Sequence, residues 1–467
     1  MTTDFKIIGE WFSPSDKEKR VSGTLNYSAS DTITLELYGS LGERQDVLDF
    51  TDYSILLGLT SDSKQITLYH CLRTGSSGSL FSNDENGKPI IFYEIQLLFI
   101  GIHIDKEEDL RFDNLTSEIH NLDEWLGISG FKNKLAGTEK DDFDISIKYK
   151  FPTPIEFKID ETANGYFIFK LDGPKLYGYQ KGYNIKQKVM FGIDFKEEKS
   201  IKKLLSYLFR FQNFLALALY ENTYPISIIL RNKRFYIKFD NTFILKQIEL
   251  YFSTSNKIYN SNTSTGTDFL FDFEHIKEEF PLIILNWYKK YDLLEPAFNL
   301  VFEQFNHRKT FNENNFLNLA QSAETFHART HNHTKIPRLE YNTMKAEILD
   351  LVPAKYHNWL IDQFKFGNNL NLHSRLSEII KEYSNEFIDK LIGDKELFIR
   401  QIKHSRNYYT HYSSNSKKAA LKGSELFHLS EKLKILLVCS FLMEVGFKKE
   451  ELEKFLEVVK WKFSSHF

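Results

Sequence analysis

The chain has 467 residues, 42% of them hydrophobic and 26% charged, so it can form two or three globular domains with sizeable cores. A formal net charge of −3 excludes a bulk attraction to nucleic acid or anionic lipid, and any polyanion must therefore bind at a local basic patch. Two cysteines, Cys71 and Cys439, are too few for a disulfide framework or a cysteine zinc site, which favours a reducing, cytoplasmic location.

No segment has the pattern of a secretory signal or of a membrane span. The first residues lack a basic stretch followed by an apolar run, so no signal peptide is expected. The most apolar stretch, from Ile90 to Ile104, contains Glu94 and is too short to cross a bilayer. We therefore expect a soluble protein with no membrane partner.

The first part of the chain has the pattern of short antiparallel strands. Runs rich in Ile, Leu, Thr and aromatic residues alternate with clusters of Asp, Ser, Gly and Asn, as in strands joined by turns. This spacing predicts antiparallel sheets in a sandwich-like arrangement. The expected strands are Phe5–Phe12, Arg20–Tyr27, Thr32–Tyr38, Gln65–Cys71, Ile91–Ile104, Asp142–Lys150, Ile155–Ile159, Tyr166–Leu171, Ile226–Leu230 and Phe235–Phe239.

One helix is expected among these strands, from Ser200 to Tyr220, because its apolar residues recur at helical spacing. The polar segment 260–268 predicts a loop. Beyond about residue 273 the pattern is helical throughout. The expected helices are Glu274–Tyr291, Leu293–Asn306, Glu313–Thr330, Thr343–Leu351, Tyr356–Gly367, Leu372–Glu382, Asn385–Ile392, Glu396–Tyr412 and Gly423–Val445.

These elements predict an α+β multidomain protein with a boundary near residue 272. Residues 1–272 would form a β-rich domain, and residues 273–467 would form an all-helical bundle. The sequence contains no internal repeat or low-complexity tract that would alter this division.

The segment from Arg406 to His411 places a cation, an amide and an imidazole on one predicted helix. At 100° per residue, Asn407 and His411 are neighbours on the helix surface, whereas Arg406 lies about 140° from His411. Either the long Arg406 side chain curls round the helix, or a second copy of the chain brings its own Arg406 to His411. The same geometry predicts a core face made of Phe398, Ile402, Ser405 and Tyr409, with Arg400, His404, Asn407 and His411 on the opposite side.

The whole chain resembles the ApeA-like phage-defence proteins of bacteria, which have a β-rich N-terminal domain and a C-terminal HEPN ribonuclease domain. Arg406 to His411 fits the R-N-x-x-x-H motif of HEPN nucleases. The segment 316–327 is similar to the helix that opens the HEPN core, and the run from Arg375 to Tyr383 fits another of its helices. In the first part, segments 9–12, 21–25 and 33–39 follow the order of the N-terminal domain, and Leu122 to Leu126 fits its L-D-x-W element.

The resemblance implies an endoribonuclease that acts in abortive infection without a metal or other cofactor. His411 would act as general base or acid, Arg406 would hold the phosphate, and Asn407 would orient the phosphate or His411. The products would be a 2',3'-cyclic phosphate and a 5'-hydroxyl. The implied partners are RNA, for example tRNA, a phage-derived trigger, which we expect to be a protein, and a second copy of the chain. Lys403, His404, Tyr408 and Tyr412 are candidates for binding the RNA backbone or stacking on bases.

Other interpretations of the sequence remain open. The Arg and His may belong to a solvated helix face, in which case the protein would be a non-catalytic binding or dimerisation protein with a ligand-binding β-sandwich. Glu324, His327, His331 and His333 have a spacing compatible with a metal site, although a structural helix end explains them as well. Lys417, Lys418 and Lys422 form either a solvated loop or a rim that contacts RNA.

Overall fold

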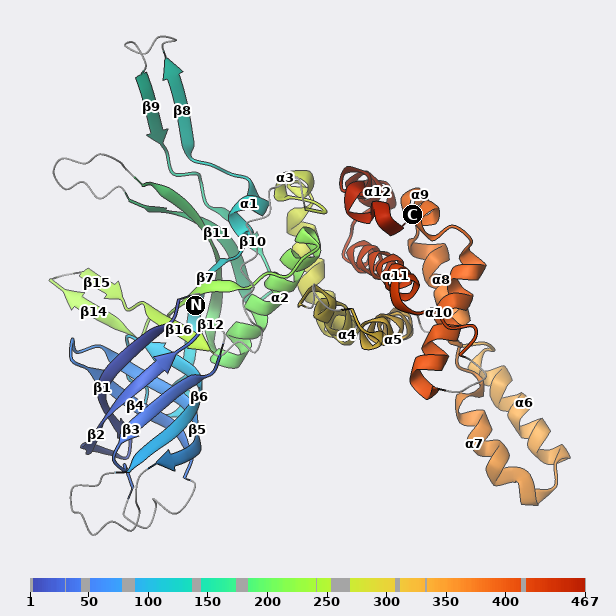
Figure 1. The fold of residues 1–467 in the computed structure, drawn as a ribbon, viewed down its shortest axis with the longest axis horizontal. Coiled ribbons are helices and arrows are strands. Elements are labelled where there is room, and N and C mark those ends of the chain that lie inside the picture. Colours follow the sequence, from blue (N-terminus) through green and yellow to red (C-terminus); the bar gives the residue numbers. More distant parts are fainter. Residues whose placement is uncertain are drawn as a thin grey trace. The chain divides into compact units, whose positions relative to one another are not determined.

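The computed structural model describes residues 3–29, 31–42, 51–77, 89–136, 144–173, 184–240, 242–252, 269–306, 311–331, 334–412 and 417–466. Two compact units make up the chain (Figure 1). The first contains Met1–Leu215 and Thr223–Pro281, and the second contains Ala216–Asn222 and Leu282–Phe467. The boundary that we predicted near residue 272 remains a proposal. Among the described residues, no helix combines the length and the apolar character that crossing a membrane requires.

The first unit begins with a closed antiparallel barrel of six strands. Strand order is β6-β3-β2-β1-β4-β5, and β5 also pairs with β6, which joins the two ends of the order. Alternate side chains of these strands point inward and are buried, as the period of two in a strand requires. The strands are β1 (Phe5–Ser13), β2 (Asp16–Tyr27), β3 (Ile33–Tyr38), β4 (Tyr53–Thr60), β5 (Gln65–Ser77) and β6 (Ile90–Ile100).

The sheet continues beyond the barrel because β6 has two partners along its other edge. Residues Ile90 to Ile95 pair with β3, and Leu97 to Ile100 pair with β16. From there the order is β16-β13-β7-β12-β11-β10, again antiparallel throughout. The prediction of an antiparallel β-rich domain is confirmed. The added strands are β7 (Arg111–Ile119), β10 (Ile155–Lys158), β11 (Ala163–Asp172), β12 (Lys186–Ser200), β13 (Pro225–Arg231) and β16 (Ile248–Phe252).

An aromatic core lies between this second half of the sheet and helix α2 (Ile201–Leu219). At its centre Trp125, from the short helix α1 (Leu122–Leu126), is fully buried. Its ring lies 5.7 to 6.5 Å from five phenylalanine rings, those of Phe167, Phe211, Phe214, Phe273 and Phe280. Trp11 is also fully buried, as expected for a core residue. Two ribbons, β8 (Phe131–Ala136) with β9 (Asp144–Tyr149) and β14 (Tyr236–Phe239) with β15 (Thr242–Leu245), complete the described strands.

The second unit is a helical bundle built around α11 (Gly423–Glu444), which is buried over most of its length. It packs against α5 (Glu313–Thr330), α8 (Leu372–Tyr383), α9 (Glu386–Ile392) and α10 (Lys395–His411). The remaining helices are α4 (Phe280–Asn306), α6 (Arg338–Leu351), α7 (His357–Gly367) and α12 (Lys449–Val458), with the short α3 (Phe273–Ile276) in the first unit. The prediction of an all-helical second part is confirmed.

One predicted helix break is wrong. The expected helices Glu274–Tyr291 and Leu293–Asn306 are largely one helix, α4, which runs through Pro296. Buried side chains on both sides of this proline, such as Trp287 and Phe298, hold the helix against the core, and their rings stack at 4.8 Å. Tertiary packing therefore outweighs the local preference of proline to end a helix.

Candidate functional site

Helix α10 carries the Arg-Asn-x-x-x-His segment, and its N-terminus is fixed by a side-chain cap. Asp394 Oδ1 accepts a hydrogen bond from the backbone N–H of Leu397 at 3.0 Å, which satisfies a donor that the helix leaves unpaired. The predicted core face is confirmed, because its four residues are at most 6% exposed. These residues are Phe398, Ile402, Ser405 and Tyr409.

Two hydrogen bonds hold Leu421, which follows the motif in the chain, against the buried side of α10. The backbone N–H of Leu421 donates to Ser405 Oγ at 3.0 Å, and Tyr409 Oη donates to the carbonyl of Leu421 at 2.9 Å. Both side chains lie on the buried face of the helix. The motif residues on the other side are thus held on a rigid helix rather than on a loop.

Arg406 turns towards α5, where it meets Glu324. Its Nη2 lies 3.3 Å from Glu324 Oε2 and 3.5 Å from Oε1, and its Nη1 donates to Asn407 Oδ1 at 3.4 Å. The side chains of Arg406 and Glu324 remain 34% and 29% exposed. These distances exceed the 2.7–2.9 Å usual for a charge-assisted hydrogen bond, so the guanidinium is held loosely and remains accessible to an anion.

His411 ends α10 with its imidazole exposed and makes no hydrogen bond or ion pair to another described residue. Asn407, one turn earlier, is half-buried. Both residues are described in the structure, and no hydrogen bond joins Arg406 to His411. Arg406 and Asn407 are therefore brought together by the structure, whereas no described side chain binds the ring nitrogens of His411.

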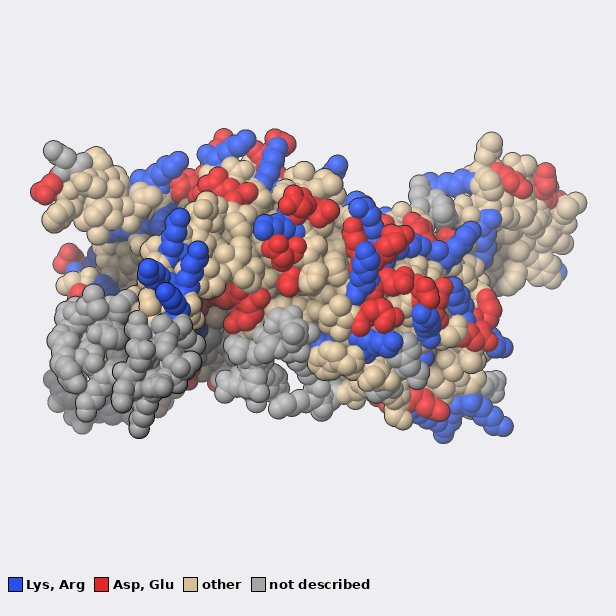
Figure 2. Space-filling view, turned by 90° about the horizontal axis from the view of Figure 1, so that it is seen from above, with Lys and Arg blue, Asp and Glu red and all other residues tan. Residues whose placement is uncertain are grey.

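The candidate RNA-binding residues surround this group. Lys403, His404 and Tyr412 are exposed, and Tyr408 is half-buried. The rings of Tyr408 and Tyr412 lie 5.4 Å apart, and Lys422 Nζ lies 5.9 Å from the centre of the Tyr408 ring. On the face in Figure 2, Lys and Arg are interspersed with Asp and Glu rather than gathered in one basic field. Any attraction for a polyanion must therefore be local.

Family comparisons test the resemblance that the sequence indicated. The model for ApeA N-terminal domain 1 matches residues 6–287, and the Apea-like HEPN model matches residues 317–451. This chain belongs to the ApeA family. The HEPN match contains Glu324 and the whole of α10, so it includes every residue of the group described above. Comparisons with curated proteins and with solved structures gave no match.

The two matches support an anti-phage defence protein of the ApeA family with a C-terminal HEPN domain. HEPN domains commonly act on RNA. The predicted resemblance is thereby confirmed over most of the chain. The roles of individual residues in this ApeA-family protein remain proposals, which the geometry of α10 supports.

The histidines that we considered as metal ligands serve to join α5 to α8. His327 Nε2 lies 2.7 Å from Glu378 Oε2, while its Nδ1 lies 3.4 Å from Arg375 Nη1, so both ring nitrogens have partners. His331 Nε2 lies 2.7 Å from Glu382 Oε2. Among the described residues, no three His, Cys, Asp or Glu side chains are arranged to hold a metal ion. His333 lies outside the described residues.

Burial lowers the pKa of His327, because an imidazolium loses its hydration in the helical core. The neutral ring donates from Nε2 to Glu378 and accepts from Arg375 at Nδ1. Arg375 also donates to the backbone carbonyl of Glu324 at 3.2 Å. The turn of α5 that carries Glu324 is therefore fixed by α8 as well as by α10.

Sequence reasoning named Glu324 only as a possible metal ligand, with a structural helix end as the other interpretation. It had been grouped with nearby histidines because of their spacing on one helix. Its actual partner, Arg406, lies 82 positions away. Spacing along one helix carries no signal for such a pair, and the packing of α5 on α10 was needed to reveal it.

Proposed function

We propose that the helical unit is a HEPN endoribonuclease that cleaves RNA without a metal ion. The observation that carries this proposal is the exposed His411, which no described residue binds, on the same rigid helix as the accessible Arg406, within the matched HEPN region. In this reaction the ribose O2' attacks the adjacent phosphorus, and the bond from phosphorus to O5' breaks. The products are a 2',3'-cyclic phosphate and a 5'-hydroxyl.

The three motif residues have separate roles in this proposal. His411 takes the proton from the 2'-hydroxyl or supplies one to the leaving O5', as its solvent access allows. Arg406 binds the phosphate oxygens and stabilises the charge that grows on them in the transition state. Asn407 contacts the Arg406 guanidinium and orients it. Lys403, His404, Tyr408 and Tyr412 bind the flanking RNA.

Two copies of the chain form the complete site in this proposal. Arg406 is directed towards α5 of its own chain, and no contact joins it to His411 there. A homodimer would place the Arg406 of one copy and the His411 of the other on the same phosphate. This arrangement also leaves each half-site inactive by itself.

The β-rich domain would control the nuclease. A ribonuclease that is always active would kill its host, so we propose that this domain responds to a phage-derived trigger, such as a protein. Cleavage of cellular RNA, for example tRNA, would then stop growth of the infected cell. This activity requires a cytoplasmic location.

Sequencing the ends of cellular RNA tests the proposed reaction. We expect that expression of the wild-type protein with a phage trigger, supplied by infection, produces new ends that carry 2',3'-cyclic phosphate and 5'-hydroxyl groups. Arg406→Ala should produce none, because no other group in the site replaces the guanidinium. Arg400→Ala is the matched control, since Arg400 is exposed on the same helix and outside the motif. New ends that persist in Arg406→Ala would refute the assigned role.

Glu324 competes with RNA for Arg406 in this proposal, so Glu324→Gln should bind RNA more tightly. The variant keeps an acceptor for the guanidinium but removes a negative charge that repels phosphate. A half-exposed ion pair contributes up to about 1 kcal/mol, which corresponds to a gain of roughly two- to fivefold in affinity. The gain is measured by fluorescence anisotropy with labelled RNA in a His411→Ala background, where no RNA is cleaved. Weaker binding by Glu324→Gln would show that the carboxylate assists RNA binding instead.

A further inference from the structure

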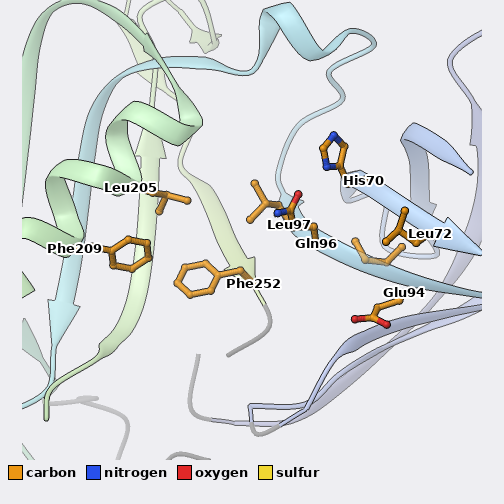
Figure 3. A pocket seen from close by; sticks show the side chains of 9 residues that line it. His70, Leu72, Glu94, Gln96, Leu97, Leu205, Phe209 and Phe252 are labelled. Atoms are coloured by element: carbon orange, nitrogen blue, oxygen red, sulfur yellow. The ribbon is translucent and has the colours of Figure 1, made fainter. Parts of the chain in front are cut away.

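A pocket of about 460 Å³ lies on the outer face of the barrel, within the first unit (Figure 3). A volume of this size is typical of sites for small organic ligands. Its walls come from three parts of the unit, namely strands β5 and β6, the end of β16 and helix α2. The pocket lies far along the chain from the HEPN motif, and no catalytic role is assigned to it above.

The pocket coincides with the point where β6 changes partners. On one edge of β6, pairing with β3 ends at Ile95, and pairing with β16 starts at Leu97. On the other edge, β5 is distorted at His70, which has a φ of 50° in the middle of the strand. A backbone in this region is costly for a residue with a side chain, and such distortions re-aim side chains at functional sites.

Three polar side chains at this distortion have hydrogen-bonding groups that the described residues leave unused, although the ring of His70 stacks on Tyr69 at 4.0 Å. His70, Glu94 and Gln96 line the pocket, and none makes a hydrogen bond or ion pair to another described residue. His70 and Gln96 are exposed, whereas Glu94 is half-buried. They supply a carboxylate, an amide and an imidazole, which together favour a ligand that donates hydrogen bonds.

The opposite wall is apolar and partly aromatic. Phe209 and Phe252 meet edge to face with their ring centres 5.8 Å apart, and Leu205 lies one turn before Phe209 on α2. In Figure 3 these side chains stand across the pocket from His70, Leu72 and Glu94. All three are half-buried, so a ligand would remove further apolar surface from water.

We infer that this pocket binds a small organic ligand with a flat apolar body and a cationic or N–H donor head. The body would pack against Phe209 and Phe252, and the head would reach the carboxylate of Glu94. None of the described residues that line the pocket is a Lys or Arg, so they offer no counter-charge to a phosphate or carboxylate. The unused hydrogen-bonding groups of His70, Glu94 and Gln96 exclude a purely apolar occupant, which would leave them desolvated.

Two probes with the same ring and opposite charge test this inference. Tryptamine carries an ammonium group on an indole, and indole-3-propionate carries a carboxylate on the same ring. At pH 8 the full-length protein should bind tryptamine with a Kd on the order of 1 mM, the affinity expected for so small a ligand. Binding is measured by ligand-observed NMR titration. Equal binding of both probes, or no binding of tryptamine at about 10 mM, would overturn the inference.

Glu94→Gln should weaken tryptamine binding about tenfold, because a charge-assisted hydrogen bond becomes a neutral one. Glu18→Gln is the control, since Glu18 is an exposed carboxylate on β2 that does not line the pocket. A thermal melt shows whether each variant is folded. Unchanged tryptamine binding in Glu94→Gln would refute the assigned role of the carboxylate. The comparison of the two probes on the wild-type protein decides the question even if a variant does not fold.

Discussion

Replacement of His411 by Ala is expected to lower the rate of RNA cleavage by about 10²- to 10⁴-fold, the contribution usual for a general acid or base. His411 ends α10 with its side chain exposed and without a partner among the described residues, so its loss removes a proton-transfer group and leaves the packing unchanged. The rate is measured in single-turnover reactions with labelled RNA. Thermal melting should give the same midpoint for the variant and the wild type.

His404→Ala is the matched control for this experiment. His404 is also an exposed histidine on α10, and it lies about two turns before His411. We expect this substitution to change the cleavage rate by no more than a few fold, through weaker RNA binding. An equal loss of rate in both variants would point to a general effect on binding and contradict the catalytic role of His411.

Mixing two inactive variants tests whether the site is shared between two copies. In a mixed dimer of Arg406→Ala and His411→Ala, one of the two sites would hold an intact Arg406 and an intact His411. Random assortment makes half of all dimers mixed, so the mixture should recover about one quarter of the wild-type activity. A site formed within one chain predicts no recovery at any mixing ratio.

The motif helix shows what the sequence could predict. The core face of α10 followed from the angular spacing of Phe398, Ile402, Ser405 and Tyr409, because a single helix fixes that geometry by itself. The orientation of Arg406 did not follow from it. Within this chain the Arg406 side chain meets Glu324, which the packing of α5 brings close, and the geometry of a single helix does not specify that contact.

Prediction of the β-rich domain from the sequence was limited in a similar way, here for whole strands and their pairing. Period-two alternation identified several strands, but β4, β7, β8, β12, β15 and β16 were missed. Strand β12 contains seven charged residues among fifteen, which obscures the apolar alternation. Closure of the barrel also requires β3 to pair with β6, two strands that are not consecutive in the chain, and no local pattern specifies that contact.

The largest stability effect is expected for Trp125→Ala, which should cost the first unit about 3–5 kcal/mol. Trp125 is fully buried among five phenylalanine rings, so truncation leaves a large cavity in the aromatic core. Its indole Nε1 is buried without a hydrogen-bond partner, and removing this donor offsets part of the loss. The free energy of unfolding of a domain is about 5–15 kcal/mol, so the variant would lose much of the stability of the first unit.

Trp359→Ala provides the comparison, because Trp359 is 63% exposed on α7, a helix without buried residues. Its replacement should change the free energy of unfolding by less than about 0.5 kcal/mol. Trp125→Phe should cost less than Trp125→Ala, since it keeps a ring in the core and removes the unpaired donor. Urea unfolding followed by far-UV circular dichroism gives the order of the three variants. If Trp125→Ala unfolds at the same urea concentration as Trp359→Ala, the aromatic cluster does not stabilise the first unit.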